Sequence, residues 1–99
     1  IMHDYQRLYE FCQEKNYRLC IVLPFVSADE WMNRHLLNLK QELEAHFSEK
    51  AFLLDVQPAI GLDAGERKRA YLDGVHPIAG IYTAIGAYAA PKLQAWVQK

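Results

Sequence analysis

The chain has 99 residues, of which 52% are hydrophobic and 23% are charged, and its formal net charge is −1. This length corresponds to one small domain or part of a larger one, and the apolar content excludes a disordered or collagen-like chain. The near-neutral charge argues against a broadly basic nucleic-acid-binding surface, and no apolar run approaches the roughly 20 residues of a membrane span.

The first residue of the chain and its two cysteines lead to two further expectations. The first residue is Ile1 rather than Met, which suggests either a processed chain or a segment of a longer reading frame, and any targeting signal would precede it. The compartment, cytoplasmic or secreted, therefore stays open. Two cysteines, Cys12 and Cys20, are too few for a disulfide scaffold, and we expect buried, inert thiols.

The first predicted element is an amphipathic helix over residues 4–15, because its apolar positions recur with helical spacing. Asp4 is suited to cap its start, and Asn16, which tolerates the left-handed conformation, is suited to end it. The apolar run Leu19–Leu23 follows and stops at Pro24. Its length and β-branched content predict a strand buried on both faces, as in a parallel sheet.

The longest predicted helix covers about residues 28–48. Ser27 and Glu30 have the S-x-x-E spacing of a capping box, which satisfies two backbone amides at a helix start. One apolar stripe then recurs at steps of four, three, four and four residues, formed by Met32, Leu36, Leu39, Leu43 and Phe47.

A second strand is predicted at Phe52–Val56, followed by a long functional loop over residues 57–76. An Ala-rich helix over about residues 79–97 ends the chain, and Pro91 should kink it or split it in two. The order helix, strand, helix, strand, loop, helix predicts a parallel sheet with helices on both faces. Because two strands leave exposed edges, we expect part of a doubly wound α/β domain.

The stretch with the clearest chemistry is Tyr71–Pro77, which contains Asp73 and His76. An Asp three residues before a His, in a turn opened by Gly74, can accept the Nδ1 proton of the imidazole and leave the other nitrogen as a general base. Asp-Gly is also a common turn pair, so Asp73 has an alternative reading as a turn residue.

This pattern resembles the D-x-x-H-P block of the SGNH (GDSL-type) esterases and lipases, which lies just before their last helix. The resemblance implies a three-layer α/β/α sandwich with a parallel sheet, of flavodoxin-like type. It also implies that Asp73 and His76 are two members of a Ser-His-Asp triad. The sequence departs from the family pattern at Ile78, where Asn is usual, and at Gly80, which comes one residue early.

The resemblance covers residues 1–99 as the C-terminal portion of a single domain of this family. The N-terminal blocks with the nucleophile and the oxyanion donors have no counterpart in the chain. The hydroxyl-bearing residues of the chain are poor replacements for the missing nucleophile. Ser27 is better explained as a helix cap, Ser48 lies near a helix end, and Thr83 lies inside the last helix. Ser27 is the least unsuitable because it follows the carboxyl end of a strand.

Other reactive groups have simpler explanations. His3, His35 and His46 lack metal-ligand spacing and are expected to face solvent, so no metal is assigned. The run Glu66–Arg69 is expected to be a solvated loop face, with a role at the mouth of the site left open. Trp31 and Trp96 are expected to pack at element ends, with an acyl pocket as the other possibility.

Two functions follow as expectations. In the first, the chain is part of a serine ester hydrolase acting on an acyl or acetyl ester of a carbohydrate or lipid, with Asp73 and His76 as catalytic residues and no cofactor. In the second, it is a non-catalytic α/β interaction module in which Asp73 and His76 are only turn residues. The oligomeric state is not predicted.

Overall fold

The structure is a computed structural model and describes residues 2–60, 71 and 79–99. Its elements in chain order are α1 (Met2–Glu14), β1 (Cys20–Val22), α2 (Glu30–Phe47), β2 (Phe52–Leu54), α3 (Gln57–Ile60) and α5 (Ala79–Val97). In this part of the chain, β1 and β2 form a two-stranded parallel sheet in which Ile21 pairs with Leu53. The predicted parallel pairing is confirmed. The architecture of the described residues is mixed α/β and mostly helical, with a small parallel sheet of two strands.

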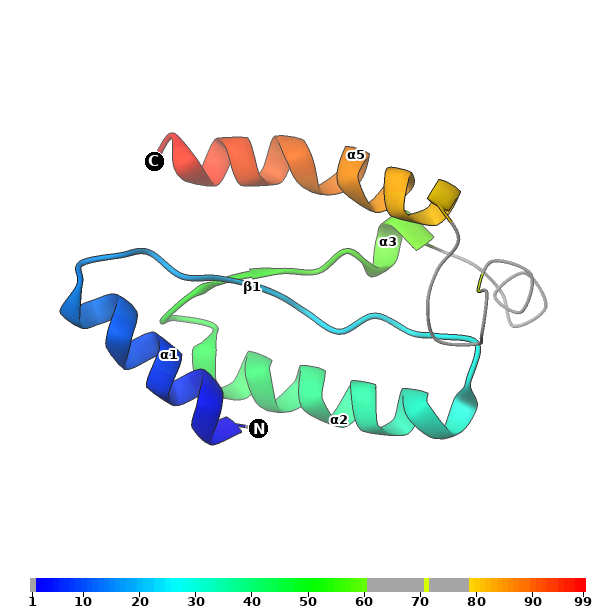
Figure 1. Cartoon of the computed structure of the whole chain (residues 1–99), viewed down its shortest axis with the longest axis horizontal. Helices are drawn as coiled ribbons and strands as arrows, with labels where there is room; N and C mark the ends of the chain where they lie inside the picture. The colour runs from blue at the N-terminus through cyan, green and yellow to red at the C-terminus, as the bar shows by residue number, and fades with distance from the viewer. Residues whose placement is uncertain (1, 61–70, 72–78) are drawn as a thin grey trace.

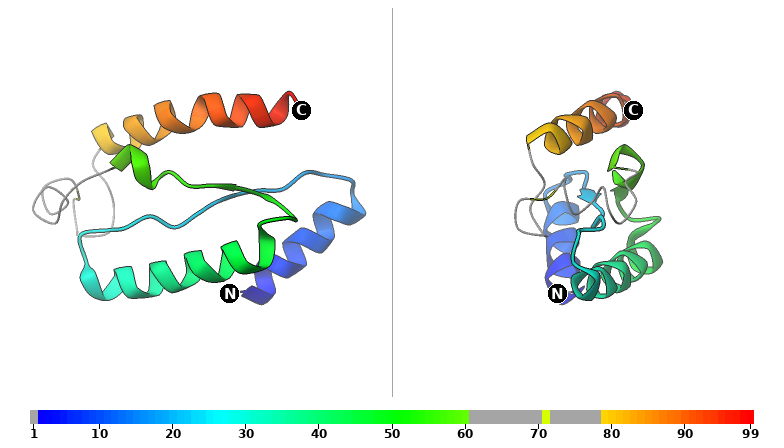
Figure 2. Two further views of the ribbon diagram at one scale, coloured as in Figure 1. Left: turned by 180° about the vertical axis from the view of Figure 1, so that it is seen from behind. Right: turned by 90° about the vertical axis from the view of Figure 1, so that its right-hand side faces the viewer.

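Helices lie on both faces of the sheet. Figure 1 shows α5 on one side of the strands and α1 with α2 on the other, and the right-hand view of Figure 2 shows the same layers end-on. One cluster of buried residues fills the space toward α1 and α2, and consists of Ile21, Leu23, Leu43 and Phe47. A second cluster lies toward α5, and consists of Leu54, Val56 and Ala89.

The end of α1 follows the sequence prediction and its start does not. Asn16 adopts a φ of 62°, the left-handed conformation expected of it. The N–H of Tyr17 donates to the carbonyl of Cys12 at 2.7 Å, the six-to-one bond of a Schellman motif. The helix begins at Met2, so Asp4 lies in its first turn and is not the N-cap. A carboxylate there still interacts favourably with the helix dipole.

The N-cap of α2 is Asp29, so the prediction that Ser27 caps this helix is wrong. The Asp29 carboxylate accepts hydrogen bonds from the N–H groups of Trp31 and Met32, at 3.0 and 3.2 Å. Ser27 lies two residues too early and bonds elsewhere, as described below. The predicted apolar stripe is confirmed, since all five of its side chains are buried or half-buried.

The segment after β2 is more regular than predicted. Residues 57–60 form the short helix α3 instead of the start of a loop. Pro58 fits its first turn, where a backbone N–H has no helical partner. The rest of the predicted loop, apart from Tyr71, lies outside the described residues.

The last helix, α5, continues through Pro91 to Val97, so of the two outcomes expected at Pro91, a kink or a split, the split does not occur. Pro91 cannot donate to the carbonyl of Ala87, but both residues are exposed, and water can take the place of that bond. Among the described residues, no helix is both long and apolar enough to cross a membrane.

Candidate functional site

The segments that follow the two strands meet at one edge of the sheet. Because β1 and β2 are parallel, their carboxyl ends lie at the same edge, on the right of Figure 1, where α2 and α5 begin and α3 lies. Ligand and active sites of open α/β sheets lie at this edge. The candidate site is therefore built from the residues after β1, the residues after β2, and Tyr71.

The backbone of Val26 connects these three segments. Its N–H donates to Oε1 of Gln57 at 2.8 Å, and its carbonyl accepts a hydrogen bond from the hydroxyl of Tyr71. Tyr71 is 5% exposed, although it is 45 residues from Val26 in sequence. Both backbone polar groups of Val26 are thus satisfied by side chains from distant segments.

Asp55 fixes the start of α3. Its Oδ1 accepts the N–H of Gln57 at 3.0 Å, and its Oδ2 lies 3.1 Å from Nζ of Lys40 on α2. The side chain of Asp55 is 43% exposed, so the ion pair itself stabilises the fold only weakly. Its main consequence is geometric: Gln57 is held where its side chain meets Val26.

Ser27 is built into the turn that leads to α2. It is 3% exposed, and its backbone N–H donates to Oδ1 of Asn33 at 2.7 Å, while Nδ2 of Asn33 donates to its carbonyl at 3.0 Å. Its hydroxyl oxygen accepts the N–H of Asp29 at 3.1 Å and lies 3.1 Å from Oδ1 of Asn33. A nucleophilic serine must present its oxygen to the substrate and to a base. These contacts give Ser27 a structural role.

The other two aliphatic hydroxyls have helix-terminal or helix-internal positions. Ser48 is the C-cap of α2. The 18 residues of that helix span about 27 Å, so Ser48 lies near the opposite edge of the sheet. Thr83 donates its hydroxyl to the carbonyl of Ala79 within α5. Thr83 lies one turn into α5, at the carboxyl edge, but its hydroxyl is bonded within its own helix.

The two predicted catalytic residues, Asp73 and His76, lie outside the described residues, as does the run Glu66–Arg69. The nearest described residues are Tyr71, two positions before Asp73, and Ala79, three positions after His76.

Sequence reasoning missed three residues of this edge, namely Asn33, Gln57 and Tyr71. Asn33 lies beside the apolar stripe of α2 and is 8% exposed, so a polar residue next to a core stripe was an available signal. Gln57 and Tyr71 had no local signal, because their partner is a backbone group far away in sequence.

The remaining reactive groups do not form a second centre in the described residues. His3, His35 and His46 are exposed, as predicted, and this part of the chain contains no group of three potential metal ligands. Cys12 is buried and Cys20 half-buried, both as free thiols, and burial raises the pKa of Cys20.

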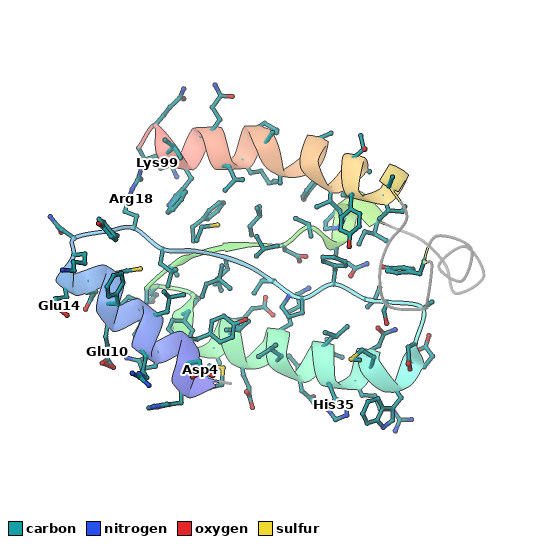
Figure 3. The ribbon with its side chains drawn as sticks, in the orientation of Figure 1. Asp4, Glu10, Glu14, Arg18, His35 and Lys99 are labelled. Atoms are coloured by element: carbon teal, nitrogen blue, oxygen red, sulfur yellow. The ribbon has the colours of Figure 1, made fainter. Side chains whose placement is uncertain are left out.

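The two tryptophans have different surroundings. Trp31 is 66% exposed and packs edge-on against the His35 ring, with 4.5 Å between ring centres. Trp96 stacks on Phe52, with 5.3 Å between ring centres. Figure 3 shows His35 on α2, on the side of the molecule away from α5. These contacts agree with packing at the ends of elements.

The chain was compared with known protein families, curated proteins and solved structures. No protein-family model matches the chain, and no curated protein or solved structure matches it significantly. The function is therefore argued from the residues and geometry of the chain itself.

Proposed function

We propose that this chain supplies the Asp and the His of a Ser-His-Asp triad in an ester hydrolase of the SGNH type. Asp73 and His76 have these roles. The proposal rests on the D-x-x-H-P motif and is supported by one structural observation: Tyr71 is buried and hydrogen-bonded to Val26 beyond the carboxyl end of β1. The start of α5, which follows the motif, lies at the same edge (Figure 1).

The reaction is acyl transfer from an ester to water, on an acyl or acetyl ester of a carbohydrate or lipid. His76 takes the proton of the nucleophilic serine as that oxygen attacks the ester carbonyl, and then gives the proton to the leaving alcohol. Asp73 accepts the Nδ1 proton of His76, holds the ring and stabilises the imidazolium. In the second half of the reaction, His76 activates the water that releases the acid.

The nucleophile in this proposal is a serine outside residues 1–99. Ser27 is 3% exposed and hydrogen-bonded to the Asn33 side chain, and Ser48 lies near the opposite edge of the sheet. The oxyanion donors belong to the same outside segment.

The proposal also extends the two strands into the parallel sheet of a three-layer sandwich. Leu19 and Leu23, on either side of β1, both form backbone bonds to residues of β2. Because every second residue of a parallel strand bonds to the same neighbour, the backbone groups of Cys20 and Val22 point away from β2. Val22 is 52% exposed although it belongs to a central apolar run. A further strand beside β1 would pair these groups and cover Val22.

The test uses the complete protein that contains these residues, a fluorophosphonate probe, and hydrolysis of p-nitrophenyl acetate. We expect the probe to label one serine other than Ser27 and Ser48. We also expect His76→Ala to lower kcat by about a thousandfold or more, whereas His35→Ala, an exposed histidine on α2, leaves it unchanged. Unchanged turnover in His76→Ala, or absence of labelling, would overturn the proposal.

The alternative function is a non-catalytic interaction module. The observation that favours it is the exposure of Val22 on β1, an edge strand of the sheet that the described residues form. An extended segment of a partner can add to such an edge. In that case neither probe labelling nor ester turnover is expected, and Val22→Lys should weaken partner binding while His76→Ala should not.

A further inference from the structure

The strand β2 has an open side in the sheet that the described residues form, because its only neighbour there is β1. The N–H of Phe52 donates to the carbonyl of Leu19 at 2.9 Å. The carbonyl of Leu54 accepts the N–H of Leu23, also at 2.9 Å. Alternate residues of a parallel strand bond toward alternate sides, so the N–H and the carbonyl of Leu53 point to the open side. An edge of this kind can pair with another extended segment.

An apolar groove lies along this open side, between β2 and α5. Its volume is about 400 Å³, which is within the range of ligand-binding pockets. The strand lines it with residues 52–55, and α5 runs back along the strand (Figure 1). The lining residues of the helix lie on one face, at steps of four, three, one and three, and are Tyr88, Lys92, Ala95, Trp96 and Lys99. Backbone pairing groups and an apolar wall therefore belong to the same groove.

The groove has cationic side chains at its rim. Nζ of Lys92 lies 4.9 Å from the centre of the Tyr88 ring, and Lys99 follows the end of α5 by two residues. The carboxylate of Asp55 is paired with Lys40 of α2 at 3.1 Å. Within the described part of the chain, neither Lys92 nor Lys99 forms an ion pair. The charge of the groove therefore complements an anionic group.

We propose that this groove binds an extended, acidic peptide segment of another protein, which adds to the sheet as a strand beside β2. The backbone of the segment pairs with Leu53, its apolar side chains enter the groove, and its carboxylates approach Lys92 and Lys99. A second copy of the chain fits less well. Antiparallel pairing of two β2 strands about a twofold axis would place both α5 helices on one face, with their lysines facing each other. The proposal goes beyond ester hydrolysis and does not depend on Asp73 or His76.

The experiment titrates the complete protein with short blocked peptides and measures binding by calorimetry. The first peptide alternates valine with glutamate, the second has lysine in place of glutamate, and the third is the first with an N-methyl group on each backbone amide. We expect the glutamate peptide to bind, and the lysine peptide to bind at least about tenfold more weakly at low salt. The N-methylated peptide should not bind, because it has no N–H groups to donate to the strand.

Variants of α5 locate the site. Ala95→Glu places an anionic side chain in the groove, whereas Ala90→Glu places the same side chain at an exposed position of α5 outside the lining. We expect Ala95→Glu to weaken binding of the glutamate peptide by about tenfold or more, and Ala90→Glu to stay within about twofold of wild type. Circular dichroism verifies that each variant is folded. Lys92→Glu, at an exposed position, repeats the test by charge reversal alone.

Hydrogen exchange locates the bound segment from the side of the strand. Pairing with the glutamate peptide should slow exchange of the Leu53 amide, because that N–H gains a hydrogen-bond partner. If the glutamate peptide does not bind, or the N-methylated peptide binds equally well, strand addition is overturned. Equal binding of the lysine peptide overturns the acidic partner, and equal losses in Ala95→Glu and Ala90→Glu overturn the location. Dimerisation in sedimentation velocity that Ala95→Glu abolishes would assign the groove to a second copy and overturn the proposal.

Discussion

Arg18 caps the carboxyl-terminal turn of α5 and stacks on Trp96. Its guanidinium donates to the carbonyl oxygens of Trp96 and Val97, at 2.8 and 3.0 Å, and its central carbon lies 4.8 Å from the centre of the Trp96 ring. The last turn of α5 has no basic residue of its own. A cation from the link between α1 and β1 therefore binds two carbonyls at the end of the helix, of which that of Trp96 also accepts the N–H of Lys99. Figure 3 shows Arg18 reaching toward this end of α5.

Replacing Arg18 should destabilise the fold by a modest amount. We expect Arg18→Ala to lower the free energy of unfolding by about 1–2 kcal/mol, because two charge-assisted bonds and the stacking contact are lost at an exposed site. Arg18→Lys should recover only part of this, since Lys lacks the planar fork. Urea denaturation gives the values, with the exposed Arg34→Ala on α2 as the control. Equal effects of Arg18→Ala and Arg34→Ala would contradict the capping role.

Asp29 should be the residue that determines the start of α2. Asp29→Ala removes the acceptor for the N–H groups of Trp31 and Met32, and we expect a loss of about 1 kcal/mol in the free energy of unfolding. Asp4→Ala is the comparison, because Asp4 lies in the first turn of α1 without capping it, and it should cost only about 0.3–0.5 kcal/mol. A larger effect at Asp4 than at Asp29 would mean that the caps are assigned to the wrong residues.

Asn33 should be more sensitive to substitution than its neighbours on α2. Asn33→Ala removes the partner of both the N–H and the carbonyl of Ser27 in a buried place, and we expect a loss of about 2–3 kcal/mol. Asn38→Ala, an exposed position of the same helix, should change stability by less than about 0.5 kcal/mol. Thermal and urea unfolding followed by circular dichroism measure both. Similar stabilities of the two variants would show that the Ser27 backbone finds other partners.

The thiol of Cys20 should make stability depend on alkaline pH. Burial raises the pKa of Cys20, so the folded protein holds this proton more tightly than the unfolded chain does. The contribution is complete below the pKa of an unfolded cysteine, about 8.5, and is lost as the pH rises through the higher pKa of the folded state. Between pH 7 and pH 10, the free energy of unfolding should therefore fall more steeply in wild type than in Cys20→Ala. Parallel pH curves for the two proteins would contradict this.

Local patterns in the sequence were sufficient to predict most of the helices. The apolar stripe of α2 was predicted because helical periodicity and burial coincide over 18 residues. Asn16 was predicted because few residues adopt a positive φ without strain. The cap of α2 was misassigned because Ser27 and Asp29 are both good capping residues, and the choice depends on Asn33 binding Ser27 one turn later.

The candidate site could be predicted only where a motif marks it. Asp73 and His76 were chosen from their spacing within a short block, and that choice stays a prediction. Gln57 and Tyr71 act on Val26 across 31 and 45 residues of chain, so no short pattern contains both partners. Such contacts follow from the tertiary arrangement, which brings the ends of β1 and β2 together.

The two core clusters lie on opposite faces of the sheet, and this division makes the fold unequal in local stability. On the α2 side, three residues of the helix are buried, whereas α5 has one buried residue in its described length, Ala89. Helices with few buried contacts detach by partial opening at a lower free energy than the whole domain unfolds. Transient release of α5 would leave α1, α2 and the sheet largely intact. A binding partner that clamps this last helix would thus stabilise a sub-global unit rather than the entire domain.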